Sequence, residues 1–395
     1  MHVGYSKCGS TTLQDTLTAN YSWLLEQKVL FPKALSDSPS WLRFFWEKNL
    51  PVSYPKGVVA SRFQRFSDDL REELLLYPVD TVILSDEGII SLSEESMVEL
   101  RVFLEEYFPE FEIHIVIIVR EPISFFTSRT QQYISDRYFD EIAIQEFFDG
   151  RNITNGESRA DNSAMNPASF YSKPISRFYE NFSNVHVLQF ERLIEGRCGL
   201  TSSFLKSCGL DVGLDDQRKN ESRSSQSIEL IAYVNRIFPF PKERRFKQVK
   251  RYYGDVRALC SISGDKFKLH RSVVDDLCVK TFSEVEWLRS RCGVDYRSVV
   301  AQANDEPIVW GDVFFRDIVR IYPDQRLAIQ FAILSFVRER CALLSDPVSV
   351  DTFKKVLKWI ECHYPCSSRI RLPVLGCALR VERILRRIKK KRFVN

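Results

Sequence analysis

The sequence lacks the features that mark a membrane, secreted or repeat protein. It has no apolar run long enough to cross a bilayer and no signal-peptide pattern, so we expect a cytoplasmic protein, with the inner face of the membrane as a second location. Met1 stands one residue before the first predicted strand, which leaves open a natural start, and a leader, further upstream. Internal repeats and low-complexity tracts are also missing.

Cysteine pairs and an excess of one charge are missing as well. The 10 cysteines include no Cys-x-x-Cys pair, which argues against a zinc ribbon and a disulfide framework. The tightest group, Cys362-His-Tyr-Pro-Cys366, has no second ligand pair nearby. The 56 basic and 52 acidic residues almost cancel, so composition gives no reason to expect a nucleic-acid partner. We therefore predict that the cysteines are reduced and serve as packing residues, and that the protein binds no metal and no nucleic acid.

What the sequence does contain is a series of short apolar runs separated by helical patterns. The runs are His2 to Tyr5, Thr81 to Ser85, Ile113 to Val119 and Val185 to Gln189. After the first run, Leu13, Leu17 and Leu24 recur at helical spacing. Unbroken apolar strands between helices form parallel sheets that are covered on both faces. The predicted fold class is therefore α/β, with a three-layer parallel sheet flanked by helices.

The pattern changes after about residue 215, where the strand signals fade. Helical patterns dominate from there, and a linker near residues 303–307 precedes a mainly helical tail. We predict a first domain over residues 1–300 and a helical C-terminal extension over residues 301–395.

The segment Gly4-Tyr-Ser-Lys-Cys-Gly9-Ser-Thr-Thr lies between the first apolar run and the first helical pattern. In such a turn, glycines, backbone amides and the helix N-terminus together favour an anion. The common nucleotide-binding loop places its lysine directly after the second glycine, but here position 10 is serine and the lysine is Lys7. This spacing disfavours an ordinary ATP or GTP site. The structural alternative is a glycine turn with a solvated lysine and a Ser/Thr helix cap.

The run from Tyr5 to Gln14 resembles the 5′-phosphosulfate loop of the sulfotransferases, which transfer a sulfuryl group from 3′-phosphoadenosine 5′-phosphosulfate (PAPS) and release PAP. The resemblance is to bacterial members and covers about residues 2–240. It implies a P-loop-type fold, PAPS as co-substrate, PAP as product and no metal, with Lys7 as the catalytic group that neutralises the leaving phosphate. The implied cofactor-binding residues are Ser6, Lys7, Cys8, Gly9, Ser10, Thr11, Thr12, Arg120 and Ser128.

The last two of these residues come from a second motif, Val119-Arg120-Glu-Pro-Ile-Ser-Phe-Phe-Thr-Ser128. It resembles the 3′-phosphate site of the family, an arginine at a strand end with a serine eight residues later. A guanidinium offers a fork of donors that suits a phosphate dianion. The structural alternative is an arginine that caps a strand end and a serine on a helix surface.

Sulfuryl transfer also needs a base for the acceptor hydroxyl at the same sheet edge. Asp86 and Glu87 come directly after the second apolar run, and the family uses a glutamate or a histidine. We favour Glu87, with Asp86 second, and a carboxylate within residues 32–37 stays open. Adjacent carboxylates at a strand end also serve as helix caps or ion-pair partners, while His2 and His114 lie within apolar runs and are interpreted as core residues.

The predicted function is therefore sulfuryl transfer from PAPS to a hydroxyl or amine acceptor, with a saccharide as the favoured acceptor by association only. One alternative is a kinase-like phosphoryl transferase, and another is a catalytically inactive glycan-binding scaffold of the same fold. A further partner is suggested by residues 380–392, where Val381, Ile384, Leu385 and Ile388 form one apolar stripe among basic residues. Such a helix either docks on the protein body or makes a peripheral contact with an anionic membrane.

Overall fold

The computed structural model describes residues 1–36, 56–137, 167–196, 199–217, 222–228, 231–232, 264–297 and 303. Most of them belong to one compact unit, drawn from Met1–Arg129, Glu146–Glu221 and Leu269–Asp305. The other described residues fall within Thr130–Gln145 and Ser222–Lys268, which belong to a second unit. The predicted functional residues all lie in the first unit.

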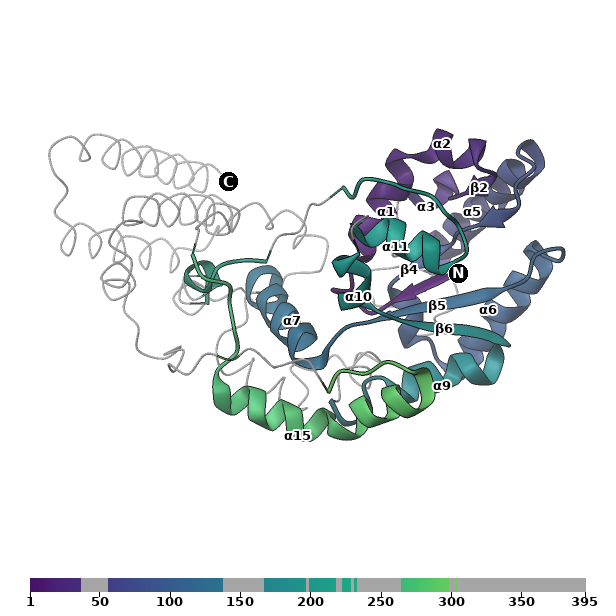
Figure 1. Ribbon diagram of the computed structural model, residues 1–395. Coiled ribbons are helices and arrows are strands. Elements are labelled where there is room, and N and C mark those ends of the chain that lie inside the picture. Colours follow the sequence, from purple (N-terminus) through teal and green to yellow (C-terminus); the bar gives the residue numbers. More distant parts are fainter. Residues whose placement is uncertain are drawn as a thin grey trace, which may run out of the picture. The chain divides into compact units, whose positions relative to one another are not determined.

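A four-stranded parallel sheet organises the first unit (Figure 1). Its strands, in spatial order, are β4 (Ser85–Asp86), β1 (His2–Gly4), β5 (His114–Val119) and β6 (Asn184–Gln189). The two neighbours of β1, β4 and β5, both run parallel to it. Successive strands therefore fall on opposite sides of β1, and in open α/β sheets ligands bind at such a switch point, beyond the carboxyl ends of the strands.

The predicted strand Thr81 to Ser85 is divided in the structure. Its first part, β3 (Thr81–Val82), pairs with β2 (Val29–Leu30) in a separate two-stranded parallel sheet. Its last part, β4, pairs with β1. Between them the Ile83 amide donates to the Leu30 carbonyl at 2.8 Å and the Leu84 carbonyl accepts from the His2 amide at 2.7 Å. One extended segment thus changes partner midway, which apolar patterning alone does not reveal.

Helices cover both faces of the sheet, so the predicted α/β class is confirmed. In Figure 1, α1 and α11 lie on one side of the strands, and α6 and α9 lie on the other. The helices are α1 (Ser10–Ala19), α2 (Tyr21–Glu26), α3 (Lys33–Ser36), α5 (Lys56–Leu76), α6 (Glu94–Tyr107), α7 (Pro122–Arg137), α9 (Ser172–Asn181), α10 (Phe190–Glu195), α11 (Gly199–Ser207) and α15 (Arg271–Trp287), with shorter turns η2 (Gly88–Ser91), η4 (Pro167–Ser169) and η5 (Leu288–Cys292).

The core lies where the sheet meets these helices. Every residue from Ile115 to Val119 is buried, as the unbroken apolar run requires for a central parallel strand. Leu13, Leu17 and Leu24 are fully buried, so their helical spacing predicted the inward face of α1 and α2 correctly. The aromatic rings of Tyr5 and Phe170 pack against each other at the start of the loop that follows β1. The Tyr5 hydroxyl also donates a hydrogen bond to the Phe170 carbonyl at 2.9 Å.

Two buried carboxylates hold helix N-termini near this edge of the sheet. Glu121 accepts hydrogen bonds from the amides of Ile123 at 2.9 Å and Ser124 at 2.6 Å, which satisfies the first turn of α7. Glu284 of α15 does the same for α9, accepting from the amides of Tyr171 at 2.6 Å and Ser172 at 2.7 Å. These caps fix the segments that flank Arg120.

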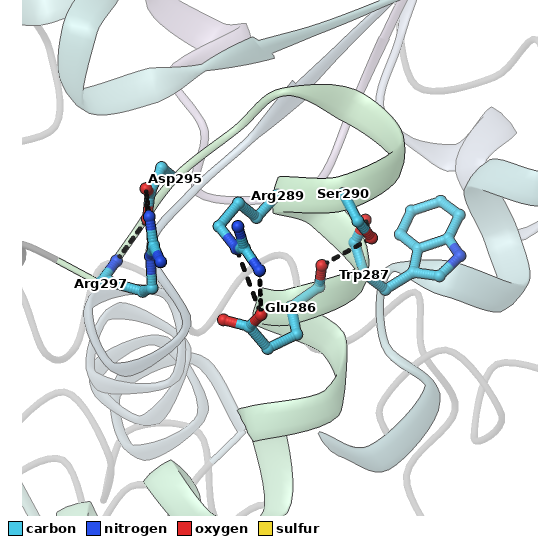
Figure 2. Close-up of polar contacts among 6 residues, drawn as sticks. All are labelled: Glu286, Trp287, Arg289, Ser290, Asp295 and Arg297. Atoms are coloured by element: carbon cyan, nitrogen blue, oxygen red, sulfur yellow. Dashed lines mark hydrogen bonds and ion pairs between the residues drawn. The ribbon is translucent and has the colours of Figure 1, made fainter.

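Ion pairs lie at the end of α15, in η5 and in the segment that follows η5. Figure 2 shows Arg289 paired with Glu286 and Arg297 paired with Asp295. The N–O distances of the two pairs are 2.6 and 2.5 Å. Hydrogen bonds from Arg297 lower the pKa of Asp295 to about 2. Because water screens such exposed pairs, they contribute little to folding.

Several predictions concern residues that the structure does not describe. The C-terminal extension 301–395, apart from residue 303, and the basic segment 380–392 lie outside the described residues. Among the described helices, none combines the length and apolarity needed to span a bilayer.

Candidate functional site

The loop that joins β1 to α1 adopts a conformation with two left-handed residues. Lys7 has a φ of 69° and Gly9, the residue before α1, has a φ of 82°. The turn is closed by a hydrogen bond of 3.2 Å from the Cys8 amide to the Tyr5 carbonyl. A non-glycine residue in the left-handed region is uncommon and costs energy, so the geometry around Lys7 must be maintained by the surrounding contacts.

The two glycines of the motif lie in close packing. A Cβ atom on Gly4 would lie 2.6 Å from the Ser10 Oγ, and one on Gly9 would lie 2.4 Å from the Leu200 Cδ2. The loop is therefore packed against the first residue of its own helix on one side and against α11 on the other. The two glycines of the sequence motif are therefore the two points at which the loop closely approaches neighbouring side chains.

A buried polar network connects the elements that lie next to the loop. His2 of β1 lies with its Nδ1 2.8 Å from the Ser85 Oγ, and the Gln14 Nε2 donates to the same hydroxyl at 3.0 Å. Burial lowers the pKa of His2 to about 3, so this imidazole is neutral. The network joins β1, β4 and α1, and it agrees with the interpretation of His2 as a core residue. The same interpretation of His114 is wrong, because His114 is the first residue of β5 and its side chain is exposed.

Arg120 leaves the end of β5 and reaches the loop. Its Nη1 donates to the Lys7 carbonyl at 2.8 Å, and its guanidinium lies 5.0 Å from the centre of the Phe190 ring. The Tyr171 hydroxyl donates to the Arg120 carbonyl, which fixes the backbone at this position. The Arg120 Nε is buried and makes no hydrogen bond in the described part of the chain. Arg120 thus supports the loop and retains an unused buried donor.

Arg129 of α7 was missed by the sequence analysis. Its Nη1 donates to the Ser6 Oγ at 2.9 Å, so a second guanidinium reaches the same loop. Ser128, the predicted partner of Arg120, is half-buried on the same helix. The only sequence signal for Arg129 was its place next to Ser128, because a single helical arginine has no motif of its own.

Glu87 lies beside the loop because of strand register. Val3 pairs with Asp86, which places Glu87 at the level of Gly4 and the start of the loop. Burial raises the pKa of the Glu87 carboxyl group, while the charges of Lys7 and Arg129 and the Ser10 hydroxyl oppose that rise. The predicted base, the predicted loop lysine and the missed arginine therefore influence one another directly.

Asp86 has a different environment. Its side chain is fully buried, and its Oδ1 accepts a hydrogen bond of 2.5 Å from the Gly88 amide at the start of η2. A carboxylate in this position satisfies a backbone donor of the following turn. The geometry thus favours Glu87 over Asp86 as the group that faces a ligand.

The remaining loop residues differ in exposure. Cys8 and Ser10 are buried, Ser6, Lys7 and Thr12 are half-buried, and Thr11 is exposed. Burial raises the pKa of the Cys8 thiol, although the charge of Arg120 opposes the shift, so Cys8 is a neutral packing group.

A half-buried acid, Glu191, lies close enough to Arg120 to interact with its charge. The Oε1 of Glu191, in the first turn of α10, accepts from the Glu121 amide at 3.0 Å. Burial raises the pKa of Glu191, and the charge of Arg120 is among the effects that oppose this rise. The contact with the chain directly after Arg120 gives Glu191 a structural role.

The arrangement has the chemistry of an anion site with an adjacent carboxylate. Lys7, Arg120 and Arg129 bring positive charge to one loop at the carboxyl end of β1, and the helix that begins there adds its N-terminal amides. Glu87, directly after the neighbouring strand β4, adds a carboxyl group beside this loop. No family model, curated protein or solved structure matches the chain.

Proposed function

We propose that this protein is a PAPS-dependent sulfotransferase that transfers a sulfuryl group to a hydroxyl or amine acceptor and releases PAP. The observation that carries the proposal is that Arg120 and Arg129 both donate hydrogen bonds to the loop containing Lys7, at 2.8 and 2.9 Å. A loop held by two guanidiniums, at the switch point of a parallel sheet, suits a ligand with several negative charges. This supports the resemblance of the loop to a phosphosulfate site.

In the proposed reaction, the acceptor oxygen attacks sulfur as the bond between sulfur and the phosphate oxygen breaks. Lys7 neutralises the charge that develops on the leaving phosphate, and Glu87 takes the proton of the acceptor. Preorganised positive charge at the leaving group is an effective form of catalysis because it needs no rearrangement during the reaction. Transfer of a sulfuryl group in this way requires no metal ion.

The environment of Glu87 suits a general base. A base is most effective when its pKa lies near the working pH, and burial shifts the pKa of Glu87 upward from its ordinary value. Lys7 and Arg129 oppose that shift and keep the carboxylate available in its ionised form. Asp86 is the weaker candidate because the Gly88 amide already occupies one of its oxygens.

The kinase-like alternative has less support. That chemistry needs a Ser or Thr directly after the loop lysine to hold magnesium, and this chain has the buried Cys8 there. The inactive glycan-binding scaffold is distinguished by experiment, since it would bind PAP without transferring sulfate to any acceptor.

Thermal unfolding with PAP, ATP and adenosine 5′-phosphosulfate tests the nucleotide site. Ligands that bind only the folded state raise the melting temperature by mass action, and we expect PAP to give the largest shift. A screen of saccharide and other hydroxyl acceptors with radiolabelled PAPS then tests transfer. Equal shifts for ATP and PAP would count against the proposal, and binding of PAP without transfer to any acceptor would support the scaffold.

The membrane contact of the basic segment 380–392 is a separate part of the proposal. It rests on the sequence pattern of basic residues around one apolar stripe. Deletion of residues 380–395 should leave PAP binding unchanged and reduce sedimentation with anionic liposomes at low salt. Failure of the full-length chain to sediment would exclude the contact, and loss of soluble expression on deletion would favour a docked helix.

A further inference from the structure

Two histidines face each other at the opposite end of the sheet, where β5 and β6 begin. The His114 Nδ1 lies 3.1 Å from the His186 Nε2, and the two rings are stacked with centres 5.3 Å apart. The register pairs His114 with Asn184 and Val116 with His186, so the histidines are diagonal neighbours on one face of two parallel strands. Both side chains are exposed.

The carboxylate of Glu112 contacts the His114 ring nitrogen that does not face His186. The Glu112 Oε2 lies 3.3 Å from the His114 Nε2, and the Asn184 Nδ2 donates to the Glu112 Oε1 at 2.9 Å. With its Nε2 proton directed to Glu112, a neutral His114 has its Nδ1 lone pair directed to His186. The amide of Asn184 in turn holds the carboxylate in place.

We propose that His114 and His186 form a surface site for a divalent transition-metal ion such as Zn²⁺ or Ni²⁺. The ion would be bound by the His114 Nδ1 and the His186 Nε2. Two imidazole nitrogens bound to a tetrahedral zinc ion at about 2.0–2.1 Å lie roughly 3.3 Å apart, close to the separation seen here without a metal. The hydrogen bond between the rings is then replaced by two metal–nitrogen bonds.

The groups around the pair match the surroundings of metal-bound histidines. Such a histidine usually donates its second ring N–H to a carboxylate, which fixes the tautomer and raises ligand basicity, and Glu112 occupies that position. On binding, the His186 proton moves from Nε2 to Nδ1, where it faces water, so a neutral pair releases no proton. Imidazole ligands favour zinc, nickel and copper over magnesium and calcium.

Water would complete the coordination shell. Within the described parts of the chain, no group of three or more His, Cys, Asp or Glu side chains is arranged to hold a metal. A two-histidine site is therefore open and exchangeable, and it would join the starts of β5 and β6. Binding only to the folded state would raise the melting temperature in a concentration-dependent way. This site is independent of the proposed transferase chemistry.

The test measures Zn²⁺ and Ni²⁺ binding to the full chain by calorimetry, after alkylation of accessible thiols such as Cys208 and Cys278. We expect one site that binds both ions and ignores Mg²⁺, and that is lost in His114→Ala and His186→Ala. Glu112→Gln should weaken binding by about 10 to 100-fold, the usual effect of changing an outer-shell partner. His270→Ala is the matched control, because it removes a half-buried imidazole at the start of α15, away from the paired histidines.

Each outcome decides the proposal. Loss of metal binding in His114→Ala and in His186→Ala, with binding retained in His270→Ala, would establish the site. A rise in melting temperature with Zn²⁺ in the wild type and His270→Ala, but not in the other two variants, would confirm it. Absence of binding by the wild-type chain, or unchanged binding in His186→Ala, would overturn it. If His114→Ala unfolds, His186→Ala and Glu112→Gln still answer the question, because both side chains are exposed.

Discussion

Arg120 donates a hydrogen bond from its Nη1 to the carbonyl oxygen of Lys7 at 2.8 Å. This contact joins the end of β5 to the loop after β1, across two strands that are neighbours in the sheet. Lys7 has a positive φ, a backbone state that neighbouring contacts must maintain. The predicted 3′-phosphate residue therefore also supports the predicted phosphosulfate loop.

The first prediction concerns Arg120→Ala. We expect PAP binding to weaken by about 2–3 kcal/mol, the range for hydrogen bonds to charged groups. Because the loop loses its support, adenosine 5′-phosphosulfate should lose affinity as well, and calorimetric titration with both nucleotides measures this. Arg297→Ala, which removes an exposed ion pair with Asp295, serves as the control and should leave binding unchanged. A loss confined to PAP would mean that Arg120 contacts only the 3′-phosphate.

The second prediction compares two glycines that share one backbone conformation. Gly9 has a φ of 82° and Gly209 a φ of 81°, but an added Cβ meets Leu200 at 2.4 Å only at Gly9 and has open space at Gly209. Both alanine variants carry the backbone cost of roughly 1–2 kcal/mol for a left-handed residue. Gly9→Ala adds an overpacking cost of about 1–3 kcal/mol. Urea unfolding measures the difference, and equal losses would mean that the loop yields without strain.

The sequence was sufficient to predict the parts of the fold that depend on local patterns. The unbroken run Ile113 to Val119 predicted a buried parallel strand. The spacing of Leu13, Leu17 and Leu24 predicted one helix with a buried face, and the structure keeps the buried face but divides the helix into α1 and α2 at Asn20. It could not show that Thr81 to Ser85 changes partner midway, because the segment forms one continuous strand pattern in the sequence. That division depends on which strand lies alongside, which is a property of the tertiary structure.

The site was predictable to the same degree. Lys7, Glu87 and Arg120 follow strand ends, and parallel strands bring such residues to one edge of the sheet. Arg129 was not predictable, because it reaches Ser6 from the middle of α7, and only the packing of that helix decides which side chain meets the loop. The distinction between Glu87 and Asp86 likewise required the Gly88 amide contact, which adjacent carboxylates in a sequence do not reveal.

The third prediction assigns the base. Glu87→Gln should retain PAP affinity and lower sulfate transfer by roughly 10² to 10⁴, the usual contribution of a positioned general base. In the wild type, turnover should fall as the pH decreases through the raised pKa of Glu87, because only the ionised carboxylate accepts a proton. Turnover measured against pH for both proteins tests this. Near-normal turnover in Glu87→Gln together with a loss in Asp86→Asn would move the assignment to Asp86.

The same variant has an expected effect on stability. Because the folded state raises the pKa of Glu87 above its ordinary value, folded chains hold a proton that unfolded chains release. The free energy of unfolding therefore decreases as the pH rises from the ordinary glutamate pKa through the folded one. Glu87→Gln removes this decrease, so its melting temperature at neutral pH should equal or exceed that of the wild type. A large loss of stability would instead indicate that the ionised carboxylate is a structural partner of Lys7 and Arg129.

The last prediction concerns acid stability and His2. Burial lowers the pKa of His2 to about 3, while an unfolded histidine titrates near about 6.5. Between these values the unfolded state binds a proton that the folded state does not, so the free energy of unfolding falls as the pH decreases through this window, by up to about 1.4 kcal/mol per pH unit. His2→Gln cannot take up the proton and should flatten this acid slope, as measured by urea unfolding from pH 7 to pH 4. Ser85→Ala is the control, because it removes the 2.8 Å contact of the ring but keeps the buried imidazole, so its stability should be lower at every pH with the slope retained. Identical slopes in the wild type and His2→Gln would mean that the His2 ring takes up a proton in the folded state, and that water reaches this buried ring.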